Sequence, residues 1–146
     1  MIEVKDIVKT YKTGNLSLTV LKGLNLSVKE GEYVAFMGPS GSGKSTFMNI
    51  LGCLDRLTSG KYILDGIDVS TMKGDELSVV RNEKIGFVFQ TFNLLPKMSA
   101  LENVALPALY AGIKKDERLK KAEEALVSVG LGDRIDHRPN EMSGGQ

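Results

Sequence analysis

Alternating apolar and polar residues in the first part of the chain predict a sheet-rich start. Apolar positions between residues 2 and 11 indicate a first strand, and Gly14-Asn15 indicates a turn. Residues 16–28 then alternate over much of their length, as a half-buried antiparallel strand pair would. A short strand is also expected at 60–64, followed by a tight turn at Asp65-Gly66.

Two other runs of β-forming or apolar residues predict buried strands. The first covers residues 33–37 and leads into a glycine-rich run, after which residues 47–51 can continue as a helix. The second covers residues 85–89 and ends at Gln90. The sheet prediction therefore extends beyond the N-terminal strands.

The second half of the chain is more helical. A short helix is expected at 75–82, and the capping box Ser99-Ala100-Leu101-Glu102 predicts another helix start. Pro107 is expected to kink that helix or end its first part. A third helix is predicted by four apolar residues at helical spacing, with Gly130 as its stop and residues 114–124 as its solvated face. The four are Leu119, Ala122, Leu126 and Val129.

The glycine-rich run carries the first chemical signal. Gly38-Pro39-Ser40-Gly41-Ser42-Gly43-Lys44-Ser45-Thr46 fits G-x-x-x-x-G-K-[ST], the phosphate-cradling loop of nucleotide triphosphatases. Glycines let backbone N–H groups approach phosphate oxygens, and a helix N-terminus favours an anion. Lys44 is expected to reach the β- and γ-phosphates, and Ser45 to bind Mg²⁺. The alternative is a plain glycine-rich turn before a helix, which the Lys-Ser pair and the strand–loop–helix context disfavour.

Composition limits the remaining possibilities. The chain has 146 residues, enough for one domain with a real core, and a formal net charge of +1, which argues against a nucleic-acid partner. Cys53 is the only cysteine, so no internal disulfide can form, and a small buried apolar role is expected for it. The start of the chain has no signal pattern, and no apolar run approaches the roughly 20 residues of a membrane span.

A second signal is Met142-Ser143-Gly144-Gly145-Gln146. Together with the phosphate loop, this run resembles the L-S-G-G-Q signature of the ATP-binding subunit of ABC transporters, with Met in place of Leu as a volume-conserving change. The resemblance covers essentially the whole chain. It implies an α/β fold: a phosphate-loop nucleotide hydrolase core with an N-terminal antiparallel β-subdomain and a helical subdomain. The implied division is 1–90 for the β-subdomain and part of the core, and 91–146 for the Q-loop and helical subdomain.

The same resemblance implies roles for single residues. Tyr11 lies where the family places an aromatic residue that stacks on adenine, although an ordinary strand aromatic would look the same. Gln90 is similar to the Q-loop glutamine that reaches Mg²⁺ and the attacking water. Lys44 and Gln90 are thus the expected catalytic residues, and Ser45 and Gln90 the expected metal ligands. The expected ATP-binding residues are Tyr11, Gly38, Ser40, Gly41, Ser42, Gly43, Lys44, Ser45, Thr46, Ser143, Gly144, Gly145 and Gln146.

The implied partners are a second copy of the subunit and a transmembrane permease. In the family two subunits bind head to tail, so that the signature acts in trans on the γ-phosphate of ATP held by the other phosphate loop. Residues 92–96 and 100–104 are similar to the subfamily of lipoprotein-release, macrolide-export and peptide-export systems. The exposed stretch 92–95 would then lie near the groove for the permease's coupling helix. The implied location is cytoplasmic, peripheral on the cytoplasmic face of the cell membrane.

The family pattern continues past the signature, which makes this chain resemble an N-terminal fragment truncated before the Walker B strand. A full-length parent is expected to be an ATPase that drives export or release of a substrate, whereas the fragment is expected to lack efficient hydrolysis and to self-associate. The alternative is a non-hydrolysing nucleotide-binding or dimerisation module. A chromosome-maintenance ATPase is disfavoured because only a short helical segment separates Gln90 from the signature. His137 precedes the signature, so a packing or surface role is expected for it.

Overall fold

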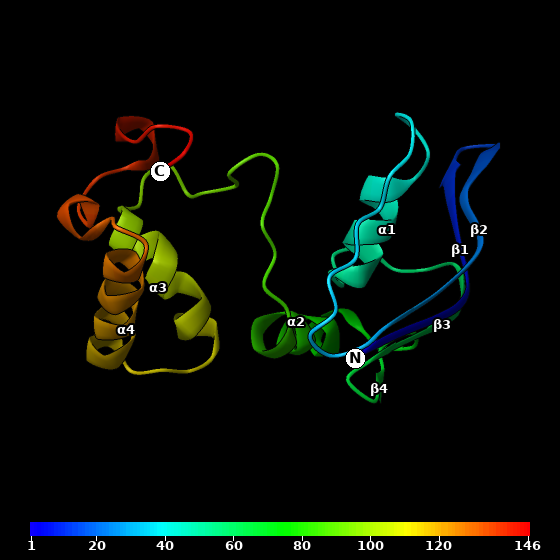
Figure 1. Cartoon of the computed structure of the whole chain (residues 1–146), viewed down its shortest axis with the longest axis horizontal. Helices are drawn as coiled ribbons and strands as arrows, with labels where there is room; N and C mark the ends of the chain where they lie inside the picture. The colour runs from blue at the N-terminus through cyan, green and yellow to red at the C-terminus, as the bar shows by residue number, and fades with distance from the viewer. The chain divides into compact units, whose positions relative to one another are not determined.

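The computed structural model describes all residues, Met1–Gln146, and divides them into two compact units. The first unit is Met1–Ile85 and the second is Gly86–Gln146. Figure 1 shows that the strands belong to the first unit and that the second is helical. The division falls before residues 86–90, which the resemblance would place with the first unit.

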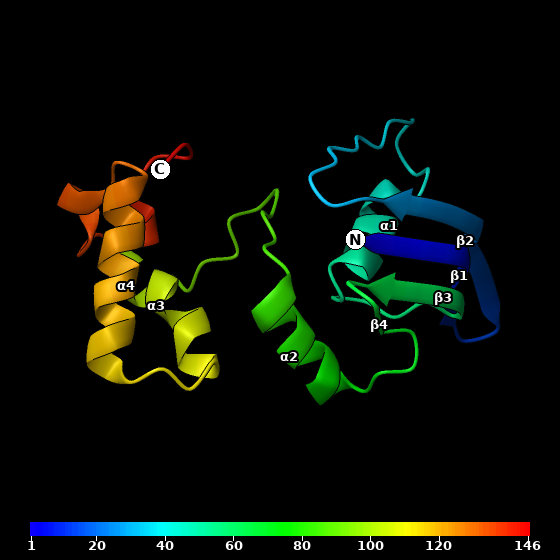
Figure 2. The same ribbon diagram turned by 60° about the horizontal axis from the view of Figure 1, so that its bottom comes forward.

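The first unit contains a four-stranded antiparallel sheet (Figure 2). Its strands are β1 (Ile2–Thr13), β2 (Leu16–Val28), β3 (Ser59–Leu64) and β4 (Ile67–Asp68), in the order β2-β1-β3-β4. The predicted strands at 2–11 and 60–64 and both turns are confirmed. Residues 16–28 form one strand and not a pair, because they contact β1 along their whole length through irregular pairing.

The core of the first unit lies between this sheet and two helices. α1 (Lys44–Leu51) buries Phe47 and Ile50, and α2 (Gly74–Lys84) buries Leu77 and Val80. They meet sheet residues that include Ile7 and Tyr62, both almost fully buried. The hydroxyl of Tyr62 donates to the carbonyl of Leu51, the last residue of α1, at 2.8 Å. The buried hydroxyl therefore has a hydrogen-bond partner. The helix predicted after the glycine-rich run and that predicted near 75–82 are both confirmed.

The predictions of strands at 33–37 and 85–89 are wrong for this structure. Neither segment pairs with a strand, although Phe36 packs edge-on against Phe47 with 5.3 Å between ring centroids. Tyr33, Met37 and Val88 are each more than nine-tenths exposed. A strand needs a neighbour to take up its N–H and C=O groups, so local β-propensity alone does not make one.

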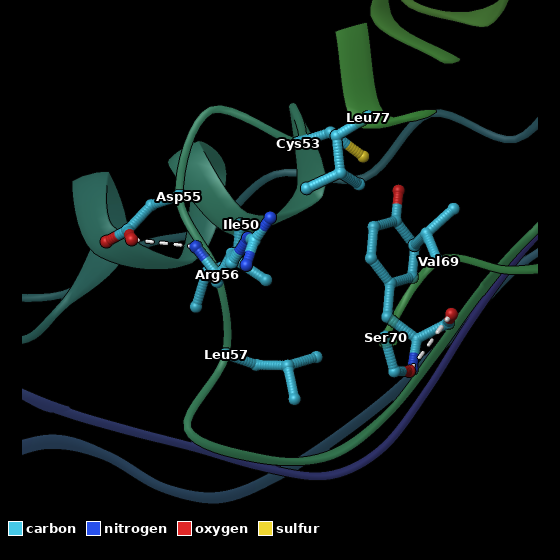
Figure 3. Close-up of a pocket in the computed structure, with 9 residues that line it drawn as sticks. Ile50, Cys53, Asp55, Arg56, Leu57, Val69, Ser70 and Leu77 are labelled. Carbon is cyan, nitrogen blue, oxygen red and sulfur yellow. Dashed lines mark hydrogen bonds between the residues drawn. The ribbon is translucent and has the colours of Figure 1, made fainter. Parts of the chain in front are cut away.

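Cys53 lies beside a small cavity of about 10 Å³ (Figure 3). The thiol is buried, and burial raises its pKa despite the opposing charge of Arg81. Arg81 donates to the Cys53 carbonyl at 2.8 Å, which ties α2 to the segment after α1. The expected apolar packing role of Cys53 is confirmed, since a raised pKa disfavours the reactive thiolate.

The second unit is built on two packed helices, α3 (Ala100–Tyr110) and α4 (Lys115–Ser128). The 3₁₀ turns η1 (Gly132–Arg134) and η2 (Pro139–Glu141) follow. The capping box is confirmed: Glu102 N donates to Ser99 Oγ, and Ser99 N donates to the Glu102 carboxylate. Pro107 does not end α3, which runs on to Tyr110.

The helical period predicted for α4 is confirmed in part. Ala122 and Leu126 are buried, as expected for the packed face. Val129 is 69% exposed, so its place in the packed face is wrong. The helix ends at Ser128, one residue before Val129. Gly130 has φ 77° and turns the chain away from the helix, as expected for the stop.

Asn103 holds the loop before α3 in shape. Its amide accepts from Leu95 N at 2.8 Å and donates to the carbonyls of Leu95, Met98 and Ser99 at 3.2, 3.1 and 2.9 Å. One half-buried side chain therefore bonds to backbone groups of three residues, Leu95, Met98 and Ser99.

Replacing Asn103 by alanine is expected to lower the free energy of unfolding by about 2 kcal/mol, because four hydrogen bonds are lost, two of them part-buried. Urea unfolding followed by circular dichroism measures the effect. Asn140→Ala is the matched control, since Asn140 is exposed and its side chain forms no hydrogen bond. An equal effect of the two changes would contradict the role given to Asn103.

Candidate nucleotide-binding site

The phosphate loop runs directly into the N-terminus of α1. Gly43 is the residue before the helix and has φ 91° and ψ 4°, in the left-handed region. No side chain caps this end, so the amides of the first helical turn remain available to a ligand. These amides and the helix dipole favour an anion at this position.

Packing as well as conformation requires glycine at position 43. A Cβ there would lie 2.9 Å from Leu21 Cδ2 and 3.2 Å from Val20 Cγ1. The end of the loop therefore rests directly on β2. A Cβ on Gly38, at the other end of the loop, would lie 2.9 Å from Ser42 Oγ, so the loop also closes on itself.

The side chain of Lys44 folds back over the loop. Its Nζ donates to the carbonyls of Gly38 and Pro39, both at 2.7 Å, and lies 3.3 Å from Ser42 Oγ. The ammonium is thus held beside the free helical amides, where phosphate oxygens would meet a positive charge and backbone donors together.

Hydroxyl groups surround the first turn of α1. Ser45 is exposed and Thr46 is half-buried, while Ser40 and Ser42 lie in the loop itself. No group of three or more His, Cys, Asp or Glu residues that could hold a metal is present. A hard cation such as Mg²⁺ would therefore take the Ser45 hydroxyl together with oxygens of the nucleotide and water. This donor set fits a metal–nucleotide complex better than a free metal ion.

A groove of about 480 Å³ lies along the loop. It is lined by Gly38, Pro39, Ser42, Gly43 and Lys44 of the loop region and by apolar residues that include Leu21 and Phe47. Its volume is within the range of small-molecule sites. Tyr11 and Ser45 are outside its lining.

Tyr11 lies near the end of β1 and is 41% exposed. Its hydroxyl donates to Asp55 Oδ2 at 2.8 Å, and Lys9 Nζ lies 4.7 Å from its ring centroid. Lys9 pairs across the strands with Leu21, the residue that contacts Gly43. Tyr11 is thus the next residue beyond Lys9 on the same face of β1, and its hydroxyl partner Asp55 follows the C-terminal end of α1.

The other expected site residues lie in the second unit. Gln90 is exposed in a segment without helix or strand. Residues 143–146 form a turn in which Ser143 N donates to Gln146 Oε1 at 2.9 Å and Gln146 N donates to the Ser143 carbonyl at 3.1 Å. The Cβ position of Gly144 is 3.6 Å from the Phe92 ring.

Two further expectations about the second unit hold. Phe92, Leu94 and Leu95 are all about half exposed or more. His137 packs instead of presenting a free imidazole: its carbonyl accepts from Ala100 N, and its ring nitrogen Nε2 lies 3.1 Å from Arg134 Nη1. His137 is partly buried, which agrees with the expected packing or surface role.

Sequence reasoning missed Lys9, Asp55 and Asn103. Lys9 is only 8% exposed, and its Nζ contacts Asp55 Oδ1 and the Arg56 carbonyl, each at 2.6 Å. A lysine in an alternating strand carries no signal for burial, and its partner is 46 positions away. Asn103 could have been suspected only from its place one turn after the N-cap residue Ser99.

The fold and the loop define a phosphate-loop nucleotide-binding protein. Comparison with known families is more specific: the family described as ABC transporter matches residues 21–146. The chain belongs to the ABC transporter family and has the ABC ATP-binding cassette fold, with an antiparallel β-subdomain and a helical part.

Particular relatives match over the whole chain. It is 57% identical to the uncharacterised ABC transporter ATP-binding protein YknY of Bacillus subtilis, of which it covers 64%. It is 55% identical to the macrolide export ATP-binding/permease protein MacB of Brucella abortus, of which it covers 23%. The chain therefore spans less than two thirds of the length of either relative.

Solved structures of ATP-binding cassettes have the same fold as this chain. The chain superposes with a TM-score of 0.90 on a dimeric post-hydrolysis structure of the ATP-binding cassette MJ0796 bound to ADP and Pi. The identity is 48%, and the match covers all of this chain and 65% of that one. None of the helices described is long and apolar enough to cross a membrane.

Proposed function

We propose that this chain binds ATP with Mg²⁺ through its phosphate loop as the nucleotide-binding part of an ABC export system. The observation that carries the proposal is the Lys44 ammonium, held by two loop carbonyls beside uncapped amides at the start of α1. Ser45 would hold the metal, and Tyr11 would stack on the base. The ADP and Pi bound by the MJ0796 cassette support a nucleotide as the ligand.

The partners and the reaction belong to the same proposal. The likeness to MacB, whose name joins an ATP-binding part to a permease, supports export through a membrane partner at the cytoplasmic face of the membrane. The dimeric MJ0796 structures support association of two copies. In the proposed dimer the copies bind head to tail, and Ser143, Gly144, Gly145 and Gln146 act on the other copy's ATP. Gln90 would link the nucleotide to the permease.

Hydrolysis is a separate step from binding. Lys44 and Ser45 account for binding phosphate and metal, but turnover also needs a group that orients and activates water. We propose nucleotide binding without efficient turnover as the behaviour of these 146 residues.

Calorimetric titration with ATP and Mg²⁺, with phosphate release followed in the same sample, tests the proposal. We expect saturable binding with little or no phosphate release. Rapid turnover would show that the described residues already hold a water-activating group. No detectable binding at millimolar ATP would contradict the assignment of the phosphate loop as the ligand site.

A further inference from the structure

We infer that Lys9 and Asp55 are positioning residues for Tyr11, and that together they hold its ring ready to stack on the base of a nucleotide. This inference rests on the proposed function, because it assigns Tyr11 to the base. It adds two residues that no motif marks. The three residues come from β1 and from the segment after α1, and they meet where that segment packs against β1.

The geometry fixes the carboxylate first. Asp55 Oδ1 accepts from Lys9 Nζ at 2.6 Å and from the Arg56 amide at 2.7 Å, while Oδ2 accepts from the Tyr11 hydroxyl at 2.8 Å. Figure 3 shows the Asp55 carboxylate with its bond to Arg56. Burial alone would raise the pKa of Asp55, but the hydrogen bonds from Lys9, Tyr11 and Arg56 outweigh it and hold the pKa below its ordinary value. Asp55 is therefore a charged, fixed acceptor at neutral pH.

Lys9 is also fixed. Its side chain is 10% exposed, and its ammonium has two oxygen partners, Asp55 and the Arg56 carbonyl. Burying an ammonium is costly unless it is paired, so both contacts are needed to keep it in place. These contacts therefore link β1 to Asp55 and Arg56, in the segment after α1.

The fixed Lys9 ammonium covers one face of the Tyr11 ring. The Lys9 ammonium lies 4.7 Å from the ring centroid, within the range of a cation–π contact. A cation on one face draws electron density from the ring, which favours stacking of an electron-rich purine on the opposite face. Leu18, paired with Tyr11 across the strands, is 66% exposed and extends this apolar surface.

Holding the ring in advance strengthens binding without any new contact to the ligand. A free tyrosine side chain must lose rotamer freedom when a base stacks on it, and that cost is removed if the hydroxyl is already anchored. The anchor should therefore affect ligands that carry a base and leave the phosphate contacts at Lys44 unchanged.

The test compares dissociation constants for ATP and for inorganic tripolyphosphate, both with Mg²⁺, in Tyr11→Phe, Asp55→Asn and Tyr11→Ala. We expect Tyr11→Phe and Asp55→Asn to weaken ATP binding roughly three- to tenfold and to leave tripolyphosphate binding unchanged. Tyr11→Ala should weaken ATP binding more than either. Tyr110→Phe, the same change on an exposed tyrosine of the second unit, is the control and should change neither constant.

Each other outcome has a distinct meaning. If Tyr11→Ala weakens ATP selectively but Tyr11→Phe and Asp55→Asn do not, the positioning role is overturned and the base site stands. If Tyr11→Ala leaves the ratio of the two constants unchanged, Tyr11 does not bind the base, and this inference fails with that assignment. A purely structural role would weaken both ligands equally and lower the thermal midpoint, which would also overturn the inference.

Discussion

Replacement of Lys44 by alanine is expected to weaken ATP binding by about a hundredfold or more. The ammonium of Lys44 is held 2.7 Å from the carbonyls of Gly38 and Pro39, next to the free amides of α1. A hydrogen bond to a charged group contributes about 1.5–3 kcal/mol, and this residue is expected to serve two phosphates. The loss of two such contacts, about 3 kcal/mol at the low end, corresponds to more than a hundredfold in affinity.

Isothermal titration of the purified variant with ATP and Mg²⁺ measures this effect, with the thermal midpoint as the check on folding. Because the lysine is half-buried and bonds only to its own loop, its loss should leave the core intact. Lys97→Ala removes an exposed lysine that forms no hydrogen bond or ion pair and should not change affinity. Undiminished ATP affinity in Lys44→Ala would contradict the assigned site.

The phosphate loop could be predicted from sequence because its requirements are local. Glycine at position 43 is needed where the backbone turns to a positive φ, and Lys44 bonds to carbonyls only five and six residues away. The capping box at Ser99 and Glu102 is equally local, and both of its hydrogen bonds are present in the structure. Features fixed within about one turn of chain are those that a single sequence specifies well.

The strands at 33–37 and 85–89 illustrate the opposite case. Their composition is that of buried strands, yet neither has a hydrogen-bonding neighbour in the structure. Periodicity reports which face of a segment is apolar but does not supply the partner that makes it a strand. The turns that join β1 to β2 and β3 to β4 were predictable because they are short and local, whereas the pairing of β1 with β3 joins strands that are not consecutive in the chain.

The cluster of Lys9, Asp55 and Tyr11 could not be predicted for a different reason. Its members are separated by 46 and 44 positions and are brought together only when β1 packs beside the segment after α1. Each residue taken alone reads as an ordinary surface or strand residue. Family resemblance assigned a role to Tyr11 but said nothing of what holds its ring.

Gly60 shows the same dependence on packing, and its replacement by alanine is expected to lower the free energy of unfolding by about 4 kcal/mol. A Cβ at this position in β3 would lie 2.5 Å from the carbonyl oxygen of Asp6 and 2.8 Å from Ile7 Cα. These are backbone atoms at the bulge of β1, where Asp6 itself has φ 48°. Gly60 has φ 104°, outside the range that L side chains adopt easily, so strain adds to the collision.

A matched control separates the two causes. Gly23 in β2 has φ 80° but open space within 4 Å of its Cβ position, so Gly23→Ala carries the conformational penalty alone, about 1 kcal/mol. Urea unfolding followed by circular dichroism gives both values. If Gly60→Ala costs no more than Gly23→Ala, then β1 and β3 do not approach as closely as described. A much larger loss for Gly60→Ala would show that the close approach of the β1 bulge to β3 adds a steric penalty to the conformational one.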